Sequence, residues 1–139
     1  MQKFYSEARV IFGDTDAMGI VYHNSYIRWF EQGRTEFLRQ LGYPYSVLEK
    51  IPLWLPLTYV HCEYKLPAVY DDLLEIASWP EKLTFATVTM AYEIRRKETG
   101  ELLVTGSTGH AITDDNLKPL KFKRVCPDLY QTITSLIES

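Results

Sequence analysis

The sequence places one long amphipathic helix near its start and then changes its hydrophobic period for the rest of the chain. Apolar residues recur three and four positions apart between Tyr26 and Leu41, which is the spacing of one helix face. Gly42 and Pro44 follow, as is typical of a helix end. From Leu57 onward, β-branched and aromatic residues dominate short segments that are separated by turn residues. The chain has no alternating βα units, which disfavours a parallel doubly wound sheet.

Five strands complete the predicted arrangement. The first is expected at about residues 4–12, and the four that follow the helix are expected at Thr58–Lys65, Leu73–Trp79, Leu83–Arg95 and Leu102–Thr113. Trp79-Pro80-Glu81 is predicted to divide two of them, and Gly100 to supply the positive φ of a hairpin turn. A helical turn is expected at Tyr45–Lys50 and a C-terminal helix at 128–138, after Pro127. These elements predict an α+β fold in a single domain, residues 1–139, with one antiparallel sheet and the helix across one face.

Gly33 lies within the apolar face of the long helix, where glycine costs about 1 kcal/mol relative to alanine. We interpret it as a point where the helix approaches the sheet closely. A sheet covered by a single helix leaves its edges and its other face open. The sequence therefore favours self-association, as a homodimer or a tetramer built as a dimer of dimers.

Composition excludes several classes of partner. The formal net charge is −3 and the pI is near 5.6, so no basic surplus is available for nucleic acid. No apolar run approaches the ~18 residues of a membrane span, and the N-terminus has no signal-peptide pattern. Cys62 and Cys126 are few and far apart, which favours reduced thiols and a cytoplasmic location. His61 and Cys62 would point to opposite faces of a strand, so no metal and no other cofactor is expected.

The loop between the first strand and the helix concentrates the chemistry of the chain. Asp14, Asp16 and His23 lie within ten residues, and the helix begins directly after them. Aspartates in loops most often serve turns and caps, which is the first interpretation. A phosphotransferase-type D-x-D pair is a second interpretation, but it belongs to parallel α/β sheets and lacks its other parts here.

A third interpretation uses the whole loop. The first N–H groups of a helix are unsatisfied and carry the positive end of its dipole, so they can stabilise an oxyanion in acyl transfer. Gly19 would let the backbone pass close to a ligand. A loop carboxylate could attack a carbonyl or activate water, and His23 could orient the substrate or share the proton transfer.

The run from Asp14 to Tyr26, D-T-D-A-M-G-I-V-Y-H-N-S-Y, followed by the helix 27–41, resembles the signature of the 4-hydroxybenzoyl-CoA thioesterase family. It is most similar to the short acyl-CoA thioesterases associated with the Tol–Pal system. The similarity continues through 63–72 and into the strand ending at 107–111. The resemblance implies a hot-dog fold, in which a five-stranded antiparallel sheet wraps the long helix. It also implies a dimer with a continuous sheet and active sites at the subunit interface.

Carried over to this chain, the resemblance assigns the catalytic carboxylate to Asp16 rather than Asp14, which we expect to hold the loop. The oxyanion donor is a backbone N–H at His23 or beside it, so Tyr22 and Asn24 join Gly19 as expected substrate contacts. The implied activity is hydrolysis of acyl-CoA, or of an acyl-carrier-protein thioester, to a free acid and a thiol.

Coenzyme A carries phosphates, which favour charge-assisted contacts with basic side chains. Lys82 and Lys121, the latter within the basic stretch 118–124, are the expected partners. Two other functions remain open at this point. One is a hot-dog hydratase or dehydratase, which would need a histidine–carboxylate pair across the dimer. The other is a scaffold that binds acyl-CoA without cleaving it. His110 and His61, both in strands, are expected to be hydrogen-bonded strand residues.

Overall fold

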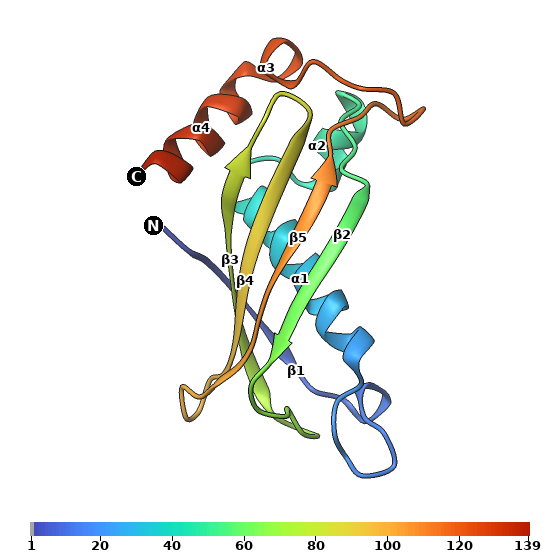
Figure 1. The fold of residues 1–139 in the computed structure, drawn as a ribbon, viewed down its shortest axis with the longest axis vertical. Helices are drawn as coiled ribbons and strands as arrows, with labels where there is room; N and C mark the ends of the chain where they lie inside the picture. The colour runs from blue at the N-terminus through green and yellow to red at the C-terminus, as the bar shows by residue number, and fades with distance from the viewer. Residues whose placement is uncertain (1) are drawn as a thin grey trace.

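The computed structural model describes residues 2–139 and consists of one antiparallel sheet with a long helix across one face (Figure 1). The strands are β1 (Phe4–Arg9), β2 (Leu57–Tyr64), β3 (Leu73–Leu83), β4 (Thr87–Arg96) and β5 (Leu102–Ala111). The helices are α1 (His23–Gln40), α2 (Tyr45–Lys50), α3 (Phe122–Val125) and α4 (Pro127–Glu138), and a 3₁₀ turn, η1, spans Phe12–Asp14. The strand order in the sheet is β1-β3-β4-β5-β2. The predicted α+β fold is confirmed.

α1 packs on the sheet through the apolar face that the sequence predicts. The ring of Phe30 stacks on Tyr92 of β4, with centroids 4.5 Å apart and planes 12° apart. At Gly33 a Cβ atom would lie 2.9 Å from the Cγ2 atom of Ile76, and the Ser78 hydroxyl donates to the Gly33 carbonyl over 3.0 Å. The interpretation of Gly33 as a close approach is therefore confirmed.

The end of α1 also follows its sequence signals. Gly42 has φ +91°, its N–H donates to the carbonyl of Arg39, and the N–H of Tyr43 donates to that of Leu38. These are the two bonds of a Schellman motif. The predicted hairpin turn is confirmed in the same way, because Gly100 has φ +76° between β4 and β5.

The predicted strand break at Trp79-Pro80-Glu81 is wrong. β3 continues through Pro80 to Leu83, and the turn lies at 84–86, where the Thr84 N–H donates to the Thr87 carbonyl. β1 pairs with β3 only as far as Ser78, so beyond that residue β3 is an edge strand, where proline is tolerated. A register shift between Pro80 and Lys82 accommodates the ring.

The first strand also ends earlier than its alternation predicts, at Arg9 rather than at residue 12. The Asp14 carboxylate accepts the Ile11 N–H at 3.0 Å, and the Asp14 N–H donates to the Ile11 carbonyl. These bonds turn the chain into η1, so the polar loop begins three residues sooner than the pattern of side chains indicates.

The sheet has two distinct ends. The loop 15–22 and the β2–β3 connection lie at one end, and the β3–β4 turn with α3 and α4 lies at the other (Figure 1). Across residues 2–139 no helix is long and apolar enough to cross a membrane.

Candidate active site

The loop before α1 is held by its own aspartates. Asp14 is buried, and its carboxylate accepts the Ile11 N–H and the Ser25 hydroxyl and pairs with Arg28. The Asp14 carbonyl accepts the Tyr22 N–H at 2.9 Å. The contacts with Tyr22, Ser25 and Arg28 fix the loop against the start of α1, and the contact with Ile11 closes the η1 turn, so Asp14 has the position of a loop-holding residue.

Asp16 is more exposed than Asp14 and uses one carboxylate oxygen for the loop. Its Oδ1 atom accepts the N–H groups of Met18 at 2.8 Å and Ile20 at 3.2 Å. Its Oδ2 atom accepts no hydrogen bond from any residue in 2–139. Gly19, in the same turn, has φ +77°, a conformation that glycine adopts without strain. One oxygen of Asp16 is thus positioned by the backbone while the other stays available.

The start of α1 offers unsatisfied backbone donors. Tyr22 is the N-cap residue and makes no side-chain cap, and the Ser25 N–H donates to the Tyr22 carbonyl at 3.1 Å. Within the described part of the chain, the N–H groups of His23 and Asn24 donate to no other residue. These two amides carry the positive end of the helix dipole, and they follow Asp16 by only seven and eight residues in the sequence.

A cavity of about 210 Å³ adjoins this helix start. The lining residues are Ile20, Val21, His23, Tyr26, Tyr64, Lys65, Leu66 and Pro67. The rings of His23 and Tyr64 lie 4.7 Å apart between centroids. Desolvation of its hydroxyl raises the pKa of Tyr64 to about 12, with a further contribution from Cys62, so this phenol is neutral at physiological pH. Of the sequence-predicted residues, His23 lines this cavity, whereas Asp16, Gly19, Tyr22 and Asn24 lie in the adjoining loop and helix start at the same end of the sheet.

Lys82 and Lys121 lie at the opposite end. β3 begins at Leu73, at the end of the sheet where Asp16 lies. Lys82 is nine residues further along this strand, a separation of roughly 30 Å from Leu73. Lys121 lines a groove of about 690 Å³ between the β3–β4 turn and α3, together with exposed Phe85, Lys123 and Arg124. A single chain therefore does not bring either lysine to Asp16.

A second cavity, of about 220 Å³, lies further along α1, where Glu31 and Arg34 face β5. His110 lines it and is 2% exposed. The His110 Nδ1–H donates to the Leu55 carbonyl at 3.1 Å, and the Nε2 atom accepts the Thr108 hydroxyl at 2.8 Å. Both ring nitrogens are occupied, so the prediction of a hydrogen-bonded strand residue is confirmed for His110.

The sequence reasoning missed the contribution of the β2–β3 connection. Lys65, Leu66 and Pro67 line the cavity beside His23, and the N–H of Ala68 donates to the Tyr26 hydroxyl at 3.1 Å. The run 63–72 resembles the family pattern, so a signal was present, but nothing in the sequence placed it beside His23. Within residues 2–139 no group of three or more His, Cys, Asp or Glu side chains is arranged to hold a metal ion.

The chain is similar in sequence and in structure to known thioesterases. Residues 10–132 match the model of the thioesterase-like superfamily. The putative acyl-CoA thioesterase YneP of Bacillus subtilis (strain 168) is 33% identical over 123 residues, 88% of each chain. The acyl-CoA thioesterase YbgC of Haemophilus influenzae is 31% identical over 124 residues, 87% of this chain and 89% of that one. A solved DHNA-CoA thioesterase from Staphylococcus aureus has a TM-score of 0.90 and 31% identity, covering 97% of this chain and 91% of that one.

Proposed function

Since this chain belongs to the thioesterase-like superfamily and is a thioester hydrolase, we propose that Asp16 and the first amides of α1 carry out the hydrolysis of its acyl-CoA substrate. One observation carries the proposal. The free Oδ2 atom of Asp16 and the unsatisfied N–H groups of His23 and Asn24 belong to the same short loop and helix start.

The chemistry follows from these groups. The thioester carbonyl oxygen accepts a hydrogen bond from the start of α1, where the negative charge of the tetrahedral intermediate is stabilised. Asp16 either removes a proton from water, whose hydroxide adds to the carbonyl carbon, or attacks that carbon itself to form an anhydride that water then cleaves. In both routes the C–S bond breaks, the thiolate takes up a proton, and the products are the free acid and the thiol.

The oxyanion donor in this proposal is a backbone group, and the His23 ring has a supporting role. The ring packs against Tyr64 at the mouth of the cavity. Gly19, Tyr22 and Asn24 contribute backbone surface around the reacting carbonyl.

The substrate is an acyl-CoA. YneP and YbgC are named as acyl-CoA thioesterases, and the Staphylococcus aureus enzyme as a DHNA-CoA thioesterase. The groove at the far end of the sheet suits the nucleotide part of coenzyme A, because Lys121, Lys123 and Arg124 are cations beside exposed Phe85. Lys82 lies close by, in a neighbouring depression that also includes Tyr130.

A homodimer would bring that groove to the loop of Asp16. β2 is the last strand of the sheet and pairs only with β5 among the described strands. It runs from the Lys121 end of the molecule to the Asp16 end (Figure 1). Antiparallel pairing of β2 with its copy would place the groove of one protomer next to the catalytic loop of the other. The free edge, with exposed Leu57, Tyr59 and Tyr64, supports this arrangement.

We place the enzyme in the cytoplasm. Both Cys62 and Cys126 are free thiols, which fits a reducing compartment.

Replacement of Asp16 by Asn tests the mechanism. The amide oxygen of Asn can still accept the two loop N–H groups, so the loop should keep its shape while the acid–base group is lost. We expect kcat for acyl-CoA hydrolysis, measured by thiol release, to fall by about 100-fold or more. His23→Ala should cost less, because the proposed donor is the backbone.

Asp115→Asn, in an exposed loop, is the matched control and should turn over normally. Near-normal turnover by a folded Asp16→Asn variant would refute the proposed mechanism. Tight binding of acyl-CoA by the wild-type protein without thiol release would refute the activity itself. Single-turnover hydrolysis in heavy-oxygen water separates the two routes, because label enters Asp16 only if its carboxylate is the nucleophile. A panel of short, long and aromatic acyl-CoA and acyl-carrier-protein thioesters identifies the acyl group.

A further inference from the structure

The loop that carries Asp16 rests on a second loop, the β2–β3 connection at residues 65–72. The N–H of Val21 donates to the carbonyl of Ala68 at 3.1 Å, and the N–H of Tyr70 donates to the carbonyl of Gly19 at 3.3 Å. Ile20 and Val69 form an isolated antiparallel bridge between these bonds. The position of the loop that carries Asp16 therefore depends on the position of the 65–72 loop.

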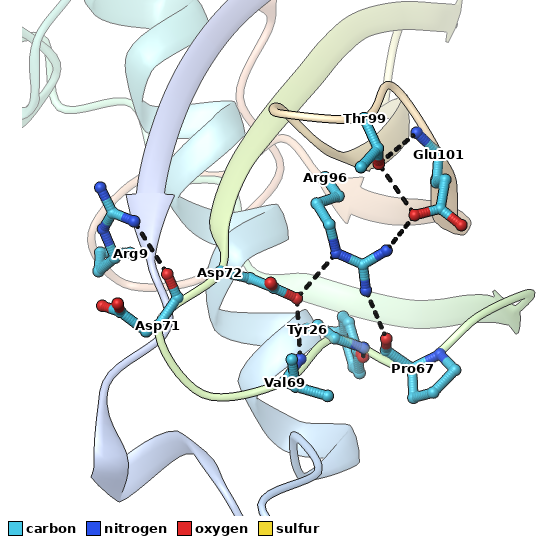
Figure 2. A network of polar contacts seen from close by, with 10 residues as sticks. Arg9, Tyr26, Pro67, Val69, Asp71, Asp72, Arg96, Thr99 and Glu101 are labelled. Atoms are coloured by element: carbon cyan, nitrogen blue, oxygen red, sulfur yellow. Dashed lines mark hydrogen bonds and ion pairs between the residues drawn. The ribbon is translucent and has the colours of Figure 1, made fainter.

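Arg96, at the end of β4, holds that loop at two points (Figure 2). Its Nε–H donates to the Asp72 carboxylate at 3.1 Å, and an Nη2–H donates to the Pro67 carbonyl at 3.0 Å. Its Nη1 atom pairs with Glu101, in the turn that follows β4. A guanidinium presents its donors in a fixed plane, which lets one side chain bind three separate acceptors.

Asp72 connects the Arg96 side chain to the backbone of two segments, at Val69 and at Val10. Its Oδ2 atom also accepts the Val69 N–H at 3.0 Å, and its carbonyl accepts the Val10 N–H at 2.9 Å. The neighbouring Asp71 has φ +69°, an uncommon conformation for a residue other than glycine. Contacts on both sides thus fix the bend that Asp71 makes.

The Arg96–Asp72 pair is shielded from water. The side chains are 18% and 15% exposed respectively. Removing one partner from such a site leaves a partly desolvated charge with fewer compensating contacts. Arg95, the preceding residue, makes more exposed contacts, to Glu93 and to the carbonyl of Gly100.

We propose that Arg96 is a positioning residue for the hydrolysis, acting through Asp72 and Pro67 on the loop that carries Asp16. The proposal rests on the roles proposed above for Asp16 and the α1 amides. Arg96 lines neither the cavity beside His23 nor the cavity beside His110. Arg96 affects the rate by fixing the position of Asp16, because a displacement of a catalytic group by about 1 Å can lower turnover by a large factor.

Three variants test this role: Arg96→Lys, Arg96→Met and, as the matched control, Arg95→Met. Lysine keeps the charge but cannot hold the Asp72, Pro67 and Glu101 oxygens in one plane. We expect Arg96→Lys to lower kcat per folded protein about tenfold, with KM changed far less, and Arg96→Met to lower it further. Arg95→Met should leave both constants unchanged.

Amide hydrogen exchange gives a readout that does not depend on activity. Exchange at Val21 and Tyr70, which donate across the two loops, should accelerate in both Arg96 variants and stay unchanged in Arg95→Met. A loss of activity that only follows the unfolded fraction would overturn the proposal, because it would indicate a general loss of stability. Normal kcat with normal exchange in Arg96→Lys would overturn it as well.

A double variant connects the two proposals. If Arg96 acts by positioning Asp16, Arg96→Lys should cost much less in the Asp16→Asn background than in wild type. Equal costs in both backgrounds would overturn the positioning role. Near-normal turnover of Asp16→Asn alone would instead refute the proposed mechanism, and the exchange rates would still decide whether Arg96 holds the loop.

Discussion

His110 is a residue whose protonation state the fold determines. Burial lowers the pKa of its imidazole to about 4, and the charge of Arg34 lowers it further, while the Leu55 carbonyl acts in the opposite direction. The neutral ring satisfies its neighbours, since one nitrogen donates to Leu55 and the other accepts from Thr108. The Thr108 hydroxyl oxygen can in turn accept the Tyr92 hydroxyl at 2.7 Å. A second proton on the ring would require the Thr108 and Tyr92 hydroxyls to reverse their hydrogen bonds.

Acid should therefore destabilise the fold through His110. The pKa in the folded state, about 4, is below the ordinary value of 6.5, so the unfolded chain binds more protons between these values. The stabilisation is complete above pH 6.5 and is lost as the pH falls towards 4, by an amount of the order of 3 kcal/mol. Urea unfolding across this range should show the loss. His110→Asn should reduce the pH dependence, whereas the same substitution at exposed His61 should not. An unchanged pH dependence in His110→Asn would contradict the prediction.

The two loop aspartates show how neighbouring residues of one type divide their roles. Asp14 is 4% exposed, and its contacts close the η1 turn and tie the loop to α1. Asp16 uses Oδ1 in the same way but leaves Oδ2 free. The turn-forming and catalytic interpretations of this loop are thus compatible, because one carboxylate has two oxygens.

At the scale of elements, contact between α1 and the sheet depends on glycines where side chains would collide. Gly106 of β5 faces the Phe30 ring, and a Cβ atom there would lie 2.4 Å from the Cζ atom of that ring and 2.7 Å from the His61 carbonyl oxygen. Neither neighbour can move freely, since the ring is stacked on Tyr92 and the carbonyl belongs to β2.

Gly106→Ala should therefore lower the free energy of unfolding by about 1–3 kcal/mol, the usual cost of overpacking. The urea midpoint measures this change. Gly13→Ala is the control, because a Cβ atom at Gly13 would meet nothing within 4 Å and the φ of Gly13 is not in the positive range. Equal midpoints for the two variants would show that α1 can withdraw from β5 without cost.

At the scale of the whole molecule, the groove that Lys121 lines lies at the opposite end of the sheet from the loop of Asp16, so the proposed site needs a second copy of the chain. Mixed dimers test this directly. A protomer with Asp16→Asn keeps its groove, and a protomer with Lys121→Glu keeps its catalytic loop. If each site combines groups from both protomers, their heterodimer contains one intact site and should show about half of the wild-type activity per dimer.

The measurement is thiol release at low acyl-CoA concentration from a co-expressed, separately tagged and purified heterodimer. Homodimers of each variant are the controls and should both be weak. A heterodimer no more active than the Lys121→Glu homodimer would show that the site lies within one chain. Light scattering of the wild-type protein gives the oligomeric state on which the experiment depends.

The predicted hot-dog fold is confirmed by the match to the Staphylococcus aureus enzyme. The hot-dog arrangement was implied by the family resemblance, whereas local physics determined the long helix and its turns from the sequence alone. The helix period, the cap at Gly42 and the turn at Gly100 each depend on a few neighbouring residues, so their patterns could be interpreted without the rest of the chain. The loop of Asp16 was identifiable for the same reason, since its carboxylate, its glycine and the helix start are adjacent in sequence.

Only the tertiary structure decided the features that depend on distant partners. β3 passes through Pro80 because β1 stops pairing at Ser78, and no local pattern records where a neighbouring strand ends. The contacts that connect Arg96 to the loop of Asp16 join residues from β4, the β2–β3 connection and the loop before α1. Lys121 lies far from Asp16 in one chain although both were predicted to serve one substrate. Side-chain chemistry can be interpreted along the sequence, whereas the distance between two groups is set by packing.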